Sequence, residues 1–200
     1  SEQRPVPKSL IFDLYGVTED DKNFSIIRAG DIAKALNESV ESPYYNLIKY
    51  PGNPRVKGKI DLSTVVSSLK RYVDVDGKFA DRNIRNLNLQ AQFIINYFAA
   101  LKFHWDKDDA WGNASQNVFF KASGFVAAIE FFFEYVFPKC IERKSFTLDY
   151  LISLFDFSEK SLITNDDVKG SDGKTARKLI IDNLKLGLKV EEPQENEYEY

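Results

Sequence analysis

Apolar residues recur at helical spacing along most of this 200-residue chain. The clearest case is residues 86–105, where apolar side chains recur at alternating intervals of four and three residues. They are Leu87, Ala91, Ile94, Phe98, Leu101 and Trp105. This spacing predicts a helix whose narrow apolar stripe packs against other helices. The same period and its proline and glycine boundaries predict further helices near 7–16, 20–36, 61–73, 145–157 and 175–188.

The run Val118–Phe137 reads VFFKASGFVAAIEFFFEYVF and holds seven of the sixteen phenylalanines. Its length suits a membrane span, but Lys121, Ser123, Glu130 and Glu134 interrupt it. One charge at mid-bilayer costs roughly 2.5–3.5 kcal/mol even on lenient scales. At about 100° per residue the serine and the two glutamates share one narrow face. The pattern therefore predicts a core helix with a thin solvent-facing edge, and no membrane association.

Lys121 does not fit this helix in a simple way. A helix continuous through Gly124 places the lysine on the apolar side, where desolvation would lower its pKa unless a carboxylate paired with it. The alternative, which is favoured, is a helix break before Gly124 that leaves Lys121 exposed. At the other end of the run, Pro138 is predicted to end the helix.

Residues 39–59 follow a different pattern, because three prolines and two glycines interrupt any helix there. Short extended pieces are predicted near 45–50 and 55–60. Together the patterns predict an all-α protein, an orthogonal multi-helix bundle of seven or eight helices with a short extended or β-hairpin insertion near 45–60. One domain is expected over 1–190, followed by a disordered acidic tail over 191–200.

The formal net charge is −3, and five glutamates of the tail account for the acidic excess. The remainder is close to neutral and does not show the strong basic character typical of nucleic-acid-binding domains. The single Cys140 excludes an internal disulfide and fits the cytoplasm, and no signal peptide pattern opens the chain. One cysteine and one histidine offer no transition-metal ligand set, so neither a metal nor a cofactor is expected.

Two loops have sequences that invite a ligand. Residues 169–175 read KGSDGKT, but their two glycines are closer together than in a phosphate-binding loop and no strand precedes them, so a turn leading into a helix is favoured. Asp106, Asp108 and Asp109 offer carboxylates to a hard cation, yet they lack the spacing of a calcium loop. A solvated loop is favoured there.

No residue is predicted to be catalytic. His104 is a candidate general base, but no serine or cysteine nucleophile lies near it in sequence, so a structural role is favoured. Cys140 lacks an activating pattern and is expected to be a packing residue. Trp105 and Trp111 flank the aspartates and are expected to anchor that loop to the core.

A short basic run interleaved with turn residues lies over 49–59. Its basic residues are Lys49, Arg55, Lys57 and Lys59. A loop of this kind can contact the phosphates of double-stranded DNA, and Arg71 extends the patch if the fold brings it near. A solvated charged surface is the alternative, and it is the one favoured from the residues alone.

Six segments carry a family resemblance. They are QRPVPKSLIFDL (3–14), SPYYNLIKYPG (42–52), IDLSTVVSSLK (60–70), FIINYFAALK (93–102), VFFKASGFVAAI (118–129) and GSDGKTARKLIIDNL (170–184). In this order they resemble the C-terminal half of DGQHR-domain proteins, the family that contains the DndB proteins of bacterial DNA phosphorothioation systems. The best-matched positions are Gln3, Lys121 and Gly124, whereas the DGQHR sequence itself is absent from these 200 residues.

The resemblance implies a non-catalytic helical lobe, a fragment of a longer bacterial protein whose upstream lobe carries the motif. It implies a role in DNA modification, its transcriptional regulation or defence against mobile DNA. The implied partners are double-stranded DNA or other DNA-modification proteins. Two alternatives stay open: part of a nuclease or nucleotide hydrolase whose active site lies in the upstream lobe, and a protein-interaction scaffold unrelated to DNA.

Overall fold

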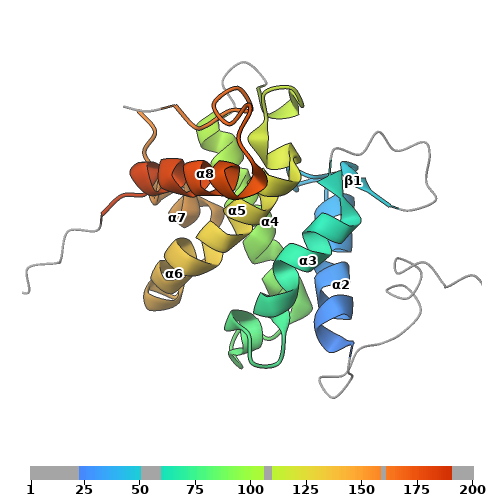
Figure 1. Cartoon of the computed structure of the whole chain (residues 1–200). Coiled ribbons are helices and arrows are strands. Elements are labelled where there is room, and N and C mark those ends of the chain that lie inside the picture. The colour runs from blue at the N-terminus through green and yellow to red at the C-terminus, as the bar shows by residue number, and fades with distance from the viewer. Residues whose placement is uncertain (1–22, 51–59, 106–109, 159–160, 191–200) are drawn as a thin grey trace, which may run out of the picture.

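The computed structural model describes residues 23–50, 60–105, 110–158 and 161–190, and within them the fold is mostly helical (Figure 1). The helices are, in chain order, α2 (Phe24–Glu38), α3 (Leu62–Val73), α4 (Leu87–Trp105), α5 (Ala122–Phe131), α6 (Phe137–Arg143), α7 (Leu148–Ser153) and α8 (Gly173–Gly187). Two short strands, β1 (Ile48–Lys49) and β2 (Ile60–Asp61), are described as well, together with short 3₁₀ turns and one π-helical segment. The predominantly helical class is therefore confirmed, while the predicted helix over 7–16 and the tail over 191–200 lie outside the described residues.

The two strands correct one part of the prediction. β1 and β2 pair in parallel, with Ile48 opposite Ile60 and Lys49 opposite Asp61. A hairpin requires antiparallel strands, so the hairpin form of the insertion is wrong. Strands of two residues are too short for an alternating pattern to show their direction. That direction is set by packing, since β2 runs straight into α3, which lies along α2 (Figure 1).

Helix α4 lies in the core and is buried on more sides than its predicted narrow stripe. The buried side chains of that stripe are Ala91, Ile94, Phe98, Leu101 and Trp105. Ile95, Tyr97 and Ala100 are buried as well, because α4 packs against both α2 and α7. A helix with neighbours on opposite sides needs apolar residues outside a single stripe.

Two fully buried tyrosines tie separate parts of this core together. The hydroxyl of Tyr44 donates a hydrogen bond to the carbonyl oxygen of Phe119 at 2.9 Å. The hydroxyl of Tyr97 donates to the carbonyl oxygen of Ala128 at the same distance. Burial raises the pKa of both phenols well above the ordinary value, so both remain protonated donors.

The phenylalanine-rich run is helical in four pieces rather than in one. A 3₁₀ turn (Val118–Phe120) precedes α5, and a π-helical segment (Phe132–Val136) joins α5 to α6. Its apolar face is fully buried at Phe125, Ile129, Phe132 and Val136. Ser123 and Glu130 are half-buried and Glu134 is exposed, which confirms the predicted core helix with a thin polar edge.

The prediction that Pro138 ends this helix is wrong, because Pro138 lies in the first turn of α6, which continues to Arg143. The main-chain N–H of Phe137 bonds to the carbonyl of Phe132, five residues back. In the same register the N–H of residue 138 would bond to the carbonyl of Phe133, but Pro138 has no N–H. The carbonyl of Phe133 therefore lacks a main-chain donor. The Nζ of Lys78 donates to that oxygen at 2.8 Å instead. The carbonyl of Phe133 therefore keeps a donor where the helix passes through the proline.

Candidate functional site

A small polar pocket is lined by residues of α3, α5 and α8. Its volume is about 180 Å³. It is lined by Ser67, Ser68, Arg71 and Tyr72 of α3, Val126 and Glu130 of α5, and Arg177 of α8. Most of these residues carry polar or charged side chains, so the pocket is suited to a polar ligand rather than an apolar one.

Helix α3 presents the hydroxyl side of the pocket because its apolar residues face the other way. The buried residues of α3 are Leu62, Val65, Leu69, Tyr72 and Val73. Ser67 and Ser68 are adjacent, and Arg71 follows one turn later, on the surface away from most of this stripe. The serine hydroxyls donate to carbonyl oxygens of their own helix, at 3.1 Å from Ser67 and 2.9 Å from Ser68. A hydroxyl can rotate, so both remain possible donors to a ligand.

Arg71 is held in place by a stack of rings. Its guanidinium lies 4.5 Å from the centroid of the Tyr72 ring and donates a hydrogen bond to the Tyr72 hydroxyl. That ring stacks on Phe133 of the π-helical segment, with 3.9 Å between centroids and 10° between planes. The hydrogen bond to Tyr72, together with the carboxylates of Glu130 and Glu134, raises the pKa of Arg71, so this guanidinium is charged at any physiological pH.

Arg177 is the second cation of the pocket, and no sequence pattern singled it out. It is half-buried in the second turn of α8. Within the described part of the chain it has no hydrogen bond or ion pair, and the same holds for Glu130 across the pocket. Both side chains can therefore form hydrogen bonds or ion pairs with a ligand. The only available signal was the spacing of Lys174, Arg177 and Lys178, which places basic residues within one turn of a helix.

The helices on either side of the pocket are basic. Helix α3 carries Lys70 and Arg71 with no acidic residue. Helix α8 carries four basic residues and one acidic residue, Asp182. The chain as a whole has a net charge of −3, whereas each of these two helices carries a net positive charge. This local excess of positive charge on two helices favours anionic partners.

The predicted DNA-contacting residues do not all gather in one place. Lys49 forms an ion pair of 3.6 Å with Asp61, and both side chains are at least half exposed. Arg71 lies ten residues beyond Asp61, close to the other end of α3, so a helix rise of about 1.5 Å per residue separates them by roughly 15 Å. Arg55, Lys57 and Lys59 lie outside the described residues.

The positions matched by the family resemblance lie at the start of α5. Lys121 is exposed and extended, and the helix begins at the next residue, which confirms the favoured break before Gly124. Gly124 has a structural role: a Cβ built there would lie 2.0 Å from the carbonyl oxygen of Val118. Gln3 lies outside the described residues.

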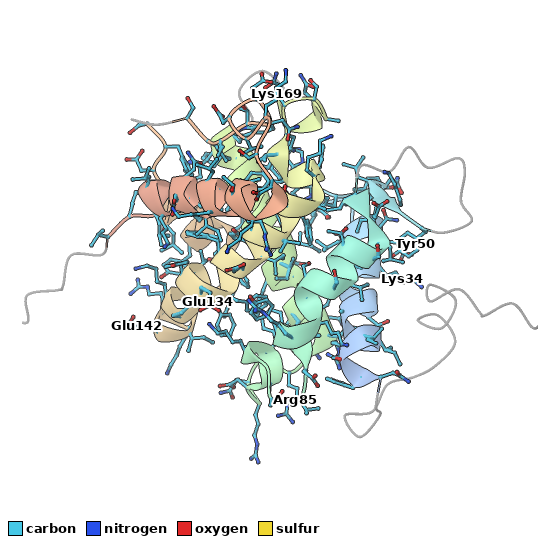
Figure 2. All side chains as sticks on the ribbon, in the orientation of Figure 1. Lys34, Tyr50, Arg85, Glu134, Glu142 and Lys169 are labelled. Carbon is cyan, nitrogen blue, oxygen red and sulfur yellow. The ribbon has the colours of Figure 1, made fainter. Side chains whose placement is uncertain are left out.

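The loop over 169–175 forms a turn into α8, as favoured from its sequence. The carboxylate of Asp172 accepts hydrogen bonds from the main-chain N–H groups of Lys174 at 2.9 Å and Thr175 at 2.8 Å. These bonds lower the pKa of Asp172. The first N–H groups of α8 are therefore occupied by the chain's own carboxylate. Figure 2 labels Lys169 in the turn that leads to this capped start.

The remaining candidates have packing roles. The Nε2 of His104 lies 2.8 Å from the carbonyl oxygen of Ile152. Cys140 is fully buried, and burial raises its thiol pKa to about 12, which agrees with the predicted packing role. Trp105 and Trp111 are buried with their rings in edge contact, so they anchor the two sides of the 106–109 connection as predicted.

Comparison with protein-family models, with curated proteins and with solved structures finds no match for this chain. Among the described helices none has the length and apolar character needed to cross a bilayer. Over the same residues no group of three or more histidine, cysteine or acidic side chains is arranged to hold a metal ion. The aspartates at 106, 108 and 109 lie outside the described residues.

Proposed function

We propose that this chain is a non-catalytic helical lobe of a DGQHR/DndB-like bacterial protein and that it contacts double-stranded DNA. In this proposal the lobe is an orthogonal bundle of seven or eight helices that works in the cytoplasm. Its role is in DNA modification, its transcriptional regulation or defence against mobile DNA, beside other DNA-modification proteins.

The observation that carries the DNA contact is the basic character of α3 and α8 around the pocket that contains Arg71 and Arg177. Cations that neutralise phosphates release counterions, so a clustered positive surface binds a duplex even within a chain of negative net charge. In this proposal the basic residues at 49, 55, 57 and 59 make further contacts with the duplex.

Fluorescence anisotropy of a labelled DNA duplex at low salt tests the proposal. We expect the wild-type chain to bind, and charge reversal by Arg71→Glu or by the pair Lys57→Glu and Lys59→Glu to weaken binding about tenfold or more, since each loses phosphate contacts. Arg143→Glu is the matched control. It reverses one exposed charge at the end of α6, next to Glu142, which Figure 2 labels far from α3.

Two results would contradict the proposal. One is that the wild-type chain does not retain a duplex at low salt. The other is that Arg143→Glu weakens binding as much as the reversals on α3 and in the 49–59 run, because binding would then follow total charge rather than this surface.

A further inference from the structure

We propose that the pocket between α3, α5 and α8 binds one phosphodiester group of a nucleic-acid backbone, with Arg71 and Arg177 as its charged donors. This inference rests on the proposed function, because DNA is the source of the phosphodiester. It adds a defined site, a second arginine that no sequence pattern identified, and a preference for a particular charge state of phosphate.

The residues that line the pocket can donate hydrogen bonds to the oxygens of a phosphate group. Arg71 from α3 and Arg177 from α8 bring two guanidinium groups to the same space of about 180 Å³. Guanidinium donates in a planar fork that matches two oxygens of a phosphate. The hydroxyls of Ser67 and Ser68 lie in the same lining and can rotate towards a further oxygen.

The size of the pocket favours one group over a whole nucleotide. Sites that enclose small molecules generally have volumes of about 300–1,000 Å³ and mostly apolar linings. This pocket is smaller, and Val126 is the only aliphatic residue in its lining. A phosphate that projects from a longer backbone requires no more space than this.

Glu130 sets the charge that the pocket accepts. Glu130 lines the pocket together with Arg71 and Arg177, so the three side chains together carry a net charge of +1. A phosphodiester carries one negative charge and matches this balance. A phosphate monoester or inorganic phosphate carries close to two at neutral pH, since its second pKa is about 6. The carboxylate therefore disfavours the dianion more strongly than the diester.

Other cations of α8 are less suited to this role. Lys178 bonds to Asp182 at 2.6 Å, and Lys185 lies 4.6 Å from the centroid of the Tyr135 ring. The N–H groups at the start of α8 bond to Asp172, so the helix terminus is not the binding group. Arg177 has no such partner within the described residues, and it is the cation of α8 that lines the pocket.

The first test compares single-charge losses on α8 by duplex anisotropy. Arg177→Gln is expected to weaken binding about tenfold and to lower the slope of log affinity against log salt by roughly one, as expected when one phosphate contact is lost. Lys174→Gln removes the same charge one turn away and is expected to cost less than threefold. Arg177→Lys keeps the charge without the fork and should recover only part of the affinity. Circular dichroism checks that each variant is folded.

The second test uses small probes and amide chemical shifts in the wild-type chain. Dimethyl phosphate, a monoanionic diester, is expected to shift the amides of Ser67, Ser68 and Arg177 and to bind more tightly than inorganic phosphate at pH 7.5. Glu130→Gln is expected to reverse that order or remove the difference. Equal binding of the two anions by the wild-type chain, or no shift at these amides, would overturn the inference.

The outcomes separate this inference from the proposed function. If the wild-type chain binds DNA but Arg177→Gln binds as well as Lys174→Gln, the pocket is not the phosphate site and the DNA contact lies elsewhere. If the wild-type chain does not bind DNA while dimethyl phosphate still shifts the pocket amides, the proposed function fails and the phosphodiester chemistry of the pocket stands.

Discussion

Replacing Gly124 by alanine should destabilise the protein, although alanine is normally the better helix residue. The new Cβ would lie 2.0 Å from the carbonyl oxygen of Val118, 2.6 Å from its carbonyl carbon and 3.2 Å from the main-chain nitrogen of Phe119. All three are backbone atoms, so no side-chain rotation can relieve the overlap. The 3₁₀ turn before α5 has to move away from the helix, together with the buried rings of Phe119 and Phe120 that it carries.

The size of the effect follows from two opposed contributions. Alanine in a helix gains about 1 kcal/mol over glycine, whereas forced overpacking costs about 1–3 kcal/mol and occasionally more. Because this overlap is with backbone, we take the upper end of that cost, which leaves a net loss of about 2 kcal/mol. For a chain of this size the melting temperature should fall by roughly 4–8 °C.

Urea denaturation followed by circular dichroism measures this loss. Gly173→Ala is the matched control, since no atom lies within 4 Å of a Cβ built at that position, and its stability should stay within about 0.5 kcal/mol of the wild type. If Gly124→Ala unfolds at the same urea concentration as the control, the close approach between α5 and the 3₁₀ turn is not present in the folded protein.

Three further outcomes follow from single contacts. Cys140, with its thiol pKa near 12, should react with an aromatic disulfide reagent only after unfolding, and rapid labelling of the folded chain at pH 8 would contradict its burial. Asp172→Ala should lower the melting temperature at neutral pH. Because folding lowers the pKa of the Asp172 carboxyl, the difference in melting temperature between wild type and variant should shrink once the pH falls below the unfolded-state pKa of about 3.9, and it should vanish below the folded-state pKa. Lys78→Met should cost about 1 kcal/mol in urea denaturation, because the carbonyl of Phe133 loses its donor; an unchanged midpoint would argue against that role.

The long helices could be predicted from the sequence because their apolar period is strong. The predicted range of 86–105 differs by one residue from the observed α4, Leu87–Trp105. Parallel pairing at Ile48 and Ile60 could not be predicted, since strands of two residues have no period. The passage of the helix through Pro138 depends on a π register and on Lys78, a residue distant in sequence.

The candidate site was predictable only in part for the same reason. Arg71 was identified as a basic residue near other basic residues, which is a local property of the chain. Its presence in one pocket with Arg177 and Glu130 depends on how three helices far apart in sequence pack together. No local pattern contains that information. The exposed position of Lys121, by contrast, followed from its place beside a helix break.

The dependence of duplex binding on salt tests the central claim most directly. Anisotropy titrations over a series of salt concentrations compare the wild-type chain with the double variant Arg71→Glu and Arg177→Glu. If the basic surface of α3 and α8 holds DNA, log affinity for the wild type falls linearly with log salt, and the slope of the double variant is smaller by roughly one unit or more. Parallel lines for the two proteins, or no binding by the wild-type chain at the lowest salt, would contradict the claim.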